Sequence, residues 1–404
     1  MLSQKFGPET VNYFAGSPLN RLSFLRSNNA FLSSALTHPS TCFLLFKDLA
    51  PLAYNPSKLA FVTHDEVKVL IGENPFEKTE KDLIKNFNSS ITLPLVLFLG
   101  INDQEQEGFE YGIYKGKPYF AVDVTLKGTV KKEASHVIET MRAKGLDFVK
   151  GRLHMTLSPS EAAIYAQACS LLDWNVRNPF CAGCGQPTLS VNAGGKRTCP
   201  PTDYASLSVP PDAPITLSSP RERPSCITRA GVSNLSFPRT DPTVITAVIS
   251  HKGDRILLGR QKRWPPNFYS TLAGFVEAGE SIEEAVRREV WEESGVTLGR
   301  VVIHSTQPWP FPANLMIGAI SQALPDGETI HLEHDPELED AKWFSLDELR
   351  EALKNGDGSR EKQPVTDDRE ADLKLPPKTA IANRLLTAVL EDLQFAQSKP
   401  SVKI

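Results

Sequence analysis

The stretch 274–296, GFVEAGESIEEAVRREVWEESGV, is the part of this sequence that decides the fold. Ser281 followed by Glu284 forms a capping box, and Gly295 is a typical helix stop, so we expect a helix between them. The apolar side of this helix is spaced for one buried face and consists of Ile282, Ala285, Val286 and Val290. The sequence therefore predicts one amphipathic helix whose core-facing side is known.

Three carboxylates lie close to that core-facing side. At 3.6 residues per turn, Glu289, Glu292 and Glu293 fall within roughly 100° of one another, and Glu289 and Glu293 continue the apolar stripe. Unpaired carboxylates on a buried face are costly, so a cation must meet them. Mg²⁺ takes oxygen ligands of this kind and joins few carboxylates to substrate phosphates. Arg288, one turn before Glu292, can hold that carboxylate in place. The alternative, a solvated acidic helix, disagrees with the phase of the carboxylates.

Length and composition limit the remaining possibilities. A chain of 404 residues is long for one core and suggests two or three domains. The net charge of −4 gives no global electrostatic case for nucleic-acid or membrane-surface binding. The apolar run 91–101 is too short to span a bilayer, and the start MLSQKFGPET lacks the apolar stretch of a signal peptide. Six cysteines are too few for a disulfide scaffold, so we expect a cytoplasmic protein without a membrane partner.

The secondary-structure patterns divide the chain into a mixed first part and an α/β last part. In the first part we expect strands at 58–62, 67–71, 93–99, 111–114 and 119–124, and helices at 134–144 and 160–172. In the last part we expect strands at 244–249, 255–258, 301–304, 316–320 and 341–344, and helices after Ser345 and at 381–393. These patterns predict an α+β domain followed by an α/β domain.

Four of the six cysteines lie between these two parts. Cys181-Ala-Gly-Cys184-Gly resembles a zinc knuckle, in which tight turns direct two thiolates at one ion. Cys199 and Cys226 are the candidate third and fourth ligands of a closed structural site. The Pro-rich stretch 200–225 separates them and is interpreted as a disordered insertion. A redox CxxC pair or simply buried thiols are the alternatives.

The acidic helix carries a family resemblance. Its sequence is similar to the Nudix box, G-x5-E-x7-R-E-U-x-E-E-x-G-U, at Gly274, Glu280, Arg288, Glu289, Val290, Glu292, Glu293, Gly295 and Val296. The run 307–312, QPWPFP, resembles the signature of the NADH pyrophosphatase branch of the Nudix hydrolases, with Thr306 and Asn314 in place of its two serines. The three prolines fix the backbone, and Trp309 and Phe311 offer ring faces for stacking a base. The alternative is a rigid linker with core aromatics.

The resemblance covers nearly the whole chain and implies an architecture. We expect an N-terminal α+β, Nudix-like accessory domain at 1–175 and a zinc ribbon at 176–238. A catalytic domain with the Nudix α/β/α sandwich fold is expected at 239–396, followed by a tail at 397–404. The overall class is thus α+β with an α/β catalytic part, and the family implies a homodimer.

The resemblance also implies roles for individual residues. Glu289, Glu292, Glu293 and Arg288 would form the catalytic group. The metal ligands, for Mg²⁺ or Mn²⁺, would be Glu289, Glu293, Glu292 (which is alternatively the base), the Ala273 carbonyl and Glu337, with Glu339 and Asp340 as rivals for the last place. The substrate-binding positions would be Phe237, Gln307, Pro308, Trp309, Pro310, Phe311, Pro312, Ala313, Asn314 and Ala382.

The implied reaction is metal-dependent hydrolysis of the diphosphate of NADH, and less efficiently NAD⁺, to a nicotinamide mononucleotide and AMP. Three alternatives stay open: removal of NAD caps from RNA 5′ ends by the same site, a broader dinucleotide pyrophosphatase, and a sensor that binds NADH without cleaving it. The C-terminal tripeptide 402–404, VKI, faintly resembles a peroxisomal signal, so a peroxisomal location is the alternative to the cytoplasm.

Overall fold

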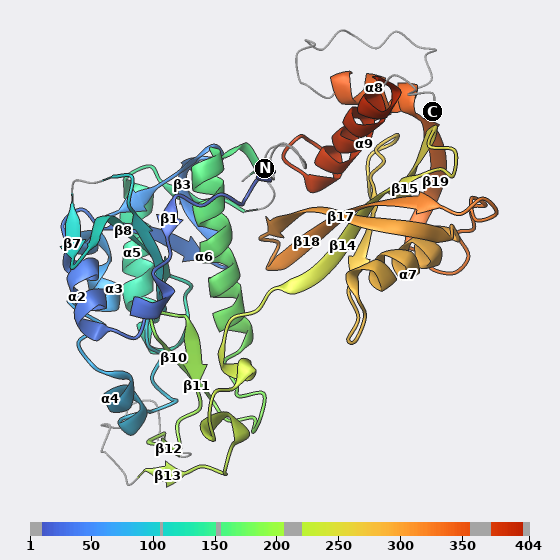
Figure 1. Cartoon of the computed structure of the whole chain (residues 1–404). Helices are drawn as coiled ribbons and strands as arrows, with labels where there is room; N and C mark the ends of the chain where they lie inside the picture. The colour runs from blue at the N-terminus through green and yellow to red at the C-terminus, as the bar shows by residue number, and fades with distance from the viewer. Residues whose placement is uncertain (1–9, 106–107, 151–154, 206–219, 356–372, 399–404) are drawn as a thin grey trace. The chain divides into compact units, whose positions relative to one another are not determined.

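The computed structural model describes residues 10–105, 108–150, 155–205, 220–355 and 373–398 (Figure 1). Two compact units divide this part of the chain, and each is described by itself. The first unit holds residues 10–15, 241–309 and those from 314 onward, and the second holds residues 16–240 and 310–313. Within the described residues, no helix has the length and apolar character needed to cross a bilayer. Separate domains at 1–175 and 176–238 stay a prediction.

A six-stranded mixed sheet forms the centre of the first unit. Its order is β17-β18-β14-β15-β19, and β16 also pairs with β14. β14 and β18 run parallel over nine residue pairs, and the other neighbours are antiparallel. The strands are β14 (Asp241–Ile249), β15 (Arg255–Gln261), β16 (Leu272–Phe275), β17 (Leu298–Trp309), β18 (Asn314–Ala323) and β19 (Leu338–Ser345).

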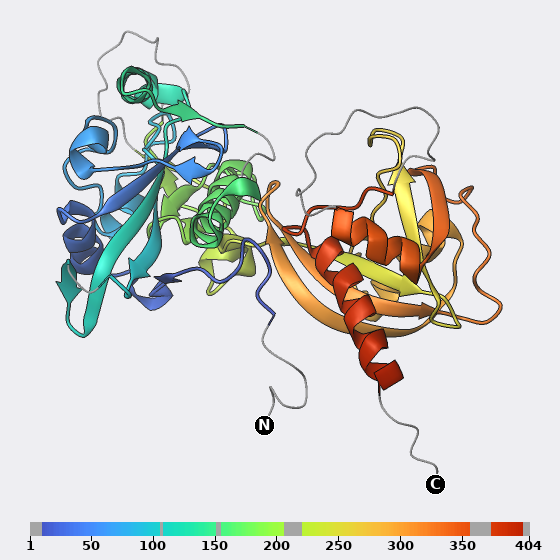
Figure 2. The ribbon, with the colours of Figure 1, turned by 90° about the horizontal axis from the view of Figure 1, so that it is seen from above.

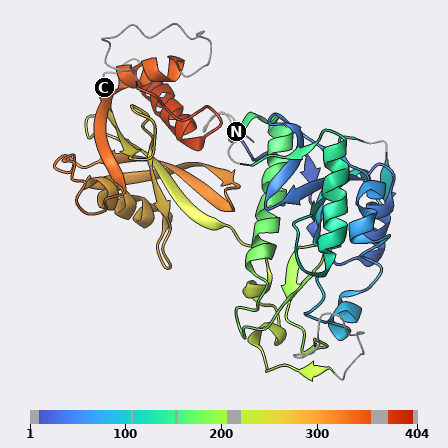
Figure 3. The ribbon, with the colours of Figure 1, turned by 180° about the vertical axis from the view of Figure 1, so that it is seen from behind.

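Both faces of this sheet are covered by helices because its central strand is apolar on both sides. Successive side chains of a strand point to opposite faces. Val244 and Val248 of β14 pack with α7 (Ile282–Ser294), whereas Ile245 and Ala247 pack with α8 (Leu346–Asn355) and α9 (Ile381–Ser398). Figures 1 and 3 show α7 on one face of the sheet and α8 with α9 on the other. The predicted α/β/α sandwich is confirmed.

The helix ends of the first unit follow the predicted capping residues. The Ser281 hydroxyl accepts from the Glu284 amide at 3.2 Å, and Gly295 ends α7 with φ 74°. The Ser345 hydroxyl likewise accepts from the Glu348 amide at the start of α8. α9 continues to Ser398, and the separate tail at 397–404 stays a prediction.

The second unit is built on a nine-stranded sheet, shown from above in Figure 2. Its strands are β1 (Leu19–Asn20), β2 (Cys42–Lys47), β3 (Ala50–Asn55), β4 (Lys58–Leu59), β5 (Phe61–Val62), β6 (Val96–Asn102), β7 (Phe109–Tyr111), β8 (Tyr114–Asp123) and β9 (Asp147–Phe148). The order β6-β8-β2-β3, with β2 parallel to β8, repeats the order β17-β18-β14-β15, with β14 parallel to β18. The two units thus share a sheet topology.

Helices cover this second sheet as well. The core on one face contains side chains of α2 (Asn29–Thr37), α3 (His64–Ile71) and α5 (Lys131–Ala143). α6 (Pro159–Arg177) packs on the sheet through Tyr165, whose ring stacks on that of Phe46 with centroids 6.1 Å apart. The remaining short elements are α4 (Glu80–Lys85) and the 3-10 turns η1 (Ser23–Leu25), η2 (Gly128–Val130), η4 (Ile227–Arg229) and η5 (Asn234–Ser236).

Two of the predicted strands are wrong. Residues 67–71 lie in α3, because Thr63 and Glu66 form a capping box and the buried residues Val67, Leu70 and Ile71 have helical spacing. Residues 111–114 form no continuous strand: Tyr111 ends β7, Tyr114 begins β8, and residues 112–113 form the turn between them, where Gly112 has φ 61°. In both places the β-branched or aromatic residues favour a strand. The neighbouring residues, a capping box in one case and a glycine turn in the other, determine the structure that forms.

The cysteine region consists of two short hairpins. One pairs β10 (Leu189–Val191) with β11 (Lys196–Thr198), and the other pairs β12 (Thr202–Asp203) with β13 (Arg221–Glu222). The stretch 200–225 was predicted to be a disordered insertion, and that is wrong for its two ends, which form the second hairpin. Residues 206–219 lie outside the described part of the chain.

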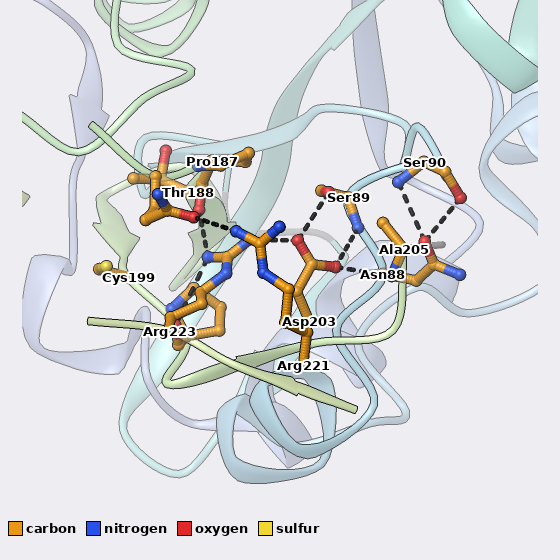
Figure 4. Close-up of polar contacts among 12 residues, drawn as sticks. Asn88, Ser89, Ser90, Pro187, Thr188, Cys199, Asp203, Ala205, Arg221 and Arg223 are labelled. Atoms are coloured by element: carbon orange, nitrogen blue, oxygen red, sulfur yellow. Dashed lines mark hydrogen bonds and ion pairs between the residues drawn. The ribbon is translucent and has the colours of Figure 1, made fainter. Parts of the chain in front are cut away.

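A buried ion pair explains why these ends are ordered. The Arg223 side chain is fully buried and donates to the Asp203 carboxylate, and its guanidinium lies over the Phe87 ring at 4.8 Å. Asp203 also accepts from the Ser89 amide and hydroxyl at 2.9 and 2.7 Å (Figure 4). These contacts join the hairpin to the segment after α4.

Candidate active site and metal centres

The fold places Glu289 and Glu293 on the buried side of α7, as the helical period predicts, and Glu292 nearer to the surface. Glu293 is 3% exposed, whereas the side chains of Glu289 and Glu292 are 15% and 38% exposed. α7 packs against β16, the strand directly before the acidic stretch in sequence. The phase argument from the sequence is confirmed, because the carboxylates continue the apolar stripe into the protein.

Glu293 is a buried acid that lacks a positively charged neighbour. Burial and the neighbouring carboxylates, Glu337 and Glu289 first, raise the pKa of Glu293 to about 9, although the Ala273 backbone amide donates to it. Among the described residues, its Oε2 atom has no hydrogen-bond partner. An orphaned carboxylate oxygen beside other acids fits a site for a cation.

Glu289 lies against the backbone of β16. A Cβ atom built at Gly274 would stand 2.0 Å from the Glu289 carboxylate, so a side chain there would displace the acid. Burial raises the pKa of Glu289, and nearby Glu292 and Glu337 raise it further, against the lowering effect of Arg288. The glycine of the box is therefore required by this close approach.

The Arg288 guanidinium donates hydrogen bonds to several neighbouring protein groups. It donates to Glu289 at 3.0 Å and to Glu292 at 2.9 Å, to both oxygens of Glu280 at 2.6 and 2.9 Å, and to the Phe275 carbonyl at 2.8 Å. Sequence reasoning placed Arg288 in the catalytic group. Its contacts join the loop after β16 to two acids of α7, and a role in catalysis stays a prediction.

Glu337 differs in its contacts from Glu339 and Asp340, the two other candidates for the last metal ligand. Glu339 pairs with Arg260, and Asp340 pairs with Lys342 at 2.9 Å and accepts from the Tyr269 hydroxyl. Glu337 instead accepts from the Gln261 amide and acts electrostatically on Glu289 and Glu293. Glu337 thus lies with the box carboxylates, as the family pattern implies.

These acids fit a hard divalent cation. Glu289, Glu293 and Glu337 would supply oxygen ligands from a helix and a loop, and Glu292 lies beside Glu289, linked through Arg288. Burial, and after it repulsion among the acids, raises the pKa values of Glu289 and Glu293, and a bound cation would remove the repulsion. The Ala273 backbone lies next to Glu293. The individual ligand roles stay predictions.

Gln307 is buried inside the first unit. It is 0% exposed, donates to the Tyr13 and Thr379 carbonyls at 2.9 and 2.8 Å, and accepts from the Ile381 amide at 2.9 Å. Asn12, beside Tyr13, donates to the Thr306 carbonyl at 2.8 Å. Gln307 was predicted to bind substrate. These bonds join β17 to the N-terminal segment and to the start of α9, and a role in substrate binding stays a prediction.

The other predicted substrate positions are divided between the two units. Trp309 packs on the α9 core and contacts the Phe14 ring edge-on at 6.1 Å, and Asn314 donates to the Thr243 hydroxyl at 3.2 Å. Ala382 is 3% exposed. Positions 310–313 and Phe237 belong to the second unit, in which residues 310–312 line a cavity of about 340 Å³ with Tyr165 and Cys169. The remaining position, Pro308, pairs with Leu315 across the β17–β18 hairpin.

The four cysteines come together in the second unit. Their sulfur atoms all lie within 4.8 Å of one another, with 3.5 Å separating Cys181 from Cys226 and Cys184 from Cys199. Four thiolates about 2.3 Å from one zinc ion stand at similar separations. The tight turn at Cys181 places the first pair, since the Gly185 amide donates to the Cys181 carbonyl at 2.7 Å. The cluster fits a closed metal site.

Two features of the active-site region were not found in the sequence. Glu280 is in the box pattern, but its bidentate contact with Arg288 needs the loop geometry. The basic run 262–263 follows β15 and lines the same hollow as Glu337. A Lys-Arg pair a few residues after the strand predicted at 255–258 was the available signal.

Comparison with known proteins agrees with this geometry. Residues 240–365 match the model of the NUDIX domain, and residues 40–174 match that of the NADH pyrophosphatase-like rudimentary NUDIX domain. The NAD-capped RNA hydrolase of Schizosaccharomyces pombe is 35% identical, over 94% of this chain and 93% of that protein. The NAD-capped RNA hydrolase NPY1 of Saccharomyces cerevisiae is 32% identical, over 95% of this chain and 96% of that protein. The mitochondrial NAD(P)H pyrophosphatase NUDT13 of Mus musculus is 33% identical, over 72% of this chain and 75% of that protein.

Proposed function

Since this chain belongs to the NADH pyrophosphatase branch of the Nudix hydrolases, we propose that it removes NAD caps from RNA 5′ ends. Water would add across the diphosphate of the cap, giving nicotinamide mononucleotide and an RNA with a 5′-monophosphate. The observation that carries this proposal is the carboxylate cluster of α7 with Glu337, in a chain that aligns end to end with relatives named for this activity.

Free NADH is the second candidate substrate. The sequence analysis placed NADH first and capped RNA among the alternatives, whereas the relatives aligned over more than nine tenths of the chain favour RNA. A relative named as an NAD(P)H pyrophosphatase supports the free dinucleotide as well. The two candidates share one chemical step, hydrolysis of a phosphoric anhydride next to AMP.

The residues of the first unit have distinct tasks in this reaction. We propose that Glu289, Glu293 and Glu337 hold Mg²⁺ or Mn²⁺, with the Ala273 carbonyl as a further ligand. Such ions neutralise the diphosphate and lower the pKa of a water. Glu292, the most exposed of the three box acids, is placed to take the proton from the attacking water. Arg288 would hold the Glu292 and Glu289 side chains in position relative to the loop after β16.

The remaining assignments belong to the same proposal. The four cysteines would hold a structural Zn²⁺, and Trp309 of the first unit would stack on a base of the dinucleotide. Phe311 and Phe237, in the second unit, stay predicted substrate positions. We propose a homodimer in the cytoplasm. The peroxisomal alternative depends on residues 402–404, which lie outside the described residues.

Product analysis tests the proposal. Purified protein with Mg²⁺ or Mn²⁺ is offered NAD-capped RNA, NADH, NAD⁺, ADP-ribose and a diadenosine compound side by side. We expect nicotinamide mononucleotide and 5′-monophosphate RNA from the capped RNA, at a kcat/KM at least equal to that for NADH. Hydrolysis of NADH without hydrolysis of capped RNA would move the second candidate to first place. No hydrolysis of any compound by folded, metal-loaded protein would contradict both candidates.

A further inference from the structure

A shallow hollow lies at the edge of the carboxylate cluster. It measures about 320 Å³ and is lined by Gln261, Lys262, Arg263 and Glu337. Gln261 ends β15 and pairs with Leu338 of β19, so the loop after β15 and the residue before β19 are held together. The side-chain amide of Gln261 makes two hydrogen bonds. Its nitrogen donates to the Glu337 carboxylate, and its oxygen accepts from the Arg263 Nε at 2.8 Å. The loop and the acid therefore form one connected wall.

Within the part of the chain that the structure describes, the two cations of this wall, Lys262 and Arg263, form no ion pair with an acid. The neighbouring basic residues, by contrast, are paired with acids: Arg260 pairs with Glu339, and Lys342 pairs with Asp340. Lys262 and Arg263 are exposed, and among the ion pairs of the described residues neither has an acidic partner. Together with Glu337 the hollow carries a net charge of +1 before any metal binds. Such a surface attracts an anion.

We propose that Lys262 and Arg263 bind the first phosphodiester groups of the RNA that follows the NAD cap. This inference rests on the proposed function and adds the RNA-binding site to it. A free dinucleotide has one diphosphate, which the metal ions at the carboxylates neutralise. An RNA end has a further phosphate after each nucleoside, and these phosphates must leave the active site over an adjacent surface. Basic side chains supply the phosphate contacts of nucleic-acid complexes.

The charge of the whole chain does not argue against this site. A net charge of −4 excludes a long basic stripe as the source of affinity. It permits a local contact to one or two phosphates, since screening limits the reach of a charge to about 8 Å at physiological ionic strength. The cap itself would supply most of the binding energy, and Lys262 with Arg263 would favour a capped polymer over a free dinucleotide.

The test compares two double variants. K262A/R263A removes the proposed phosphate contacts. K252A/R300A removes the same charge from the opposite end of the sheet, where Lys252 and Arg300 are also exposed. For each protein, kcat/KM is measured with a short NAD-capped RNA and with NADH, at several salt concentrations.

We expect K262A/R263A to lower the ratio of the two kcat/KM values, RNA over NADH, by about tenfold. For this variant, the slope of log kcat/KM for RNA against the logarithm of the salt concentration should be less steep by about 1.4. Each lost phosphate contact on a single strand accounts for about 0.7 of this slope. K252A/R300A should keep both the ratio and the slope of the wild type.

Three outcomes would overturn the inference. An unchanged ratio would remove these residues from RNA binding and leave the proposed function intact. An equal loss with both substrates would assign the two residues to the dinucleotide itself. An inability of the wild type to hydrolyse capped RNA, with NADH hydrolysed, would contradict the proposed function and this inference together.

Discussion

Arg288 and Glu280 form a bidentate ion pair, with Nε 2.6 Å from one carboxylate oxygen and Nη2 2.9 Å from the other. Glu280 precedes the helix and Arg288 lies two turns into it, so the pair fixes the loop after β16 on α7. The same guanidinium reaches Glu289 and Glu292. The box arginine thus connects a loop outside the helix to two of the acids that form the candidate site.

Replacing Glu280 with Gln should reduce turnover although Glu280 lies outside the carboxylate cluster. A neutral amide offers only one acceptor to Arg288 and opposes its other donor, so the guanidinium will shift and move Glu289 and Glu292. We expect kcat to fall by about tenfold to a hundredfold, in line with misplaced catalytic groups. Steady-state kinetics measure this, with E283Q on the first turn of α7 as the matched control. Equal kcat values in both variants would contradict the positioning role.

Replacing Glu293 with Gln should abolish most activity while the protein stays folded. The amide keeps the shape of the side chain but cannot ionise, so it removes the negative charge that a bound cation would meet at this buried position. We expect kcat to fall by about 10²- to 10⁴-fold, the range typical of a lost catalytic group. Circular dichroism and a titration with Mn²⁺ accompany the kinetics. Normal turnover would exclude Glu293 from the chemistry.

The metal-free protein should lose stability as the pH rises from about 4.5 to about 9. The pKa of Glu293 is about 9 in the folded state and 4.5 as the reference for the unfolded chain. Between these values the folded state binds more protons than the unfolded state, so the free energy of unfolding decreases with pH. Thermal melts in the presence of a chelator measure this slope. E293Q should reduce it, and added Mg²⁺ should oppose it; a slope identical in E293Q would contradict the assignment.

Replacing Gln307 with Ala should destabilise the first unit. The change leaves the Tyr13 and Thr379 carbonyls and the Ile381 amide without their partner in a buried place. Each unsatisfied buried group costs about 1–3 kcal/mol. Q322A removes a single bond, from the same residue type to the His251 carbonyl, and serves as the control. A free energy of unfolding that falls no more in Q307A than in Q322A would argue against a structural role.

Replacing Cys226 with Ser should remove the bound zinc. The Cys226 sulfur lies 3.5 Å from that of Cys181 and completes the four-thiol cluster. Three thiolates cannot close a tetrahedral structural site, so the metal content of the purified protein should fall from about one zinc per chain to nearly none. Elemental analysis measures this, and C42S outside the cluster is the control. Zinc retained in C226S would exclude Cys226 as a required ligand, and zinc absent from the wild type would favour the alternative of buried thiols.

Local sequence was sufficient for the active helix. Ser281, Glu284 and Gly295 fix where α7 begins and ends, because caps act within one turn. The 3.6-residue period then places Glu289 and Glu293 on the buried side without any knowledge of the rest of the fold. The cysteine set was found for a related reason, since a C-x-x-C turn is local and few other cysteines were available.

Long-range contacts decided the remaining features. Glu337, Glu339 and Asp340 are nearly adjacent in sequence, and only the pairing of β19 with β15 shows which of them faces the box acids. The burial of Gln307 depends on partners about 290 and 70 residues away in the sequence, so no local pattern could reveal it.

The sequence by itself determined the family, the reaction class and the residues of α7, since helix period and capping are properties of a few neighbouring residues. The tertiary structure alone decided the contacts of Gln307, Arg288 and Glu337 and the position of the Lys262–Arg263 pair beside Glu337. The physical reason is that these contacts depend on which strands pair, in which register, and on how the loops between them fold, and such contacts bring together groups whose separation in sequence carries no signal.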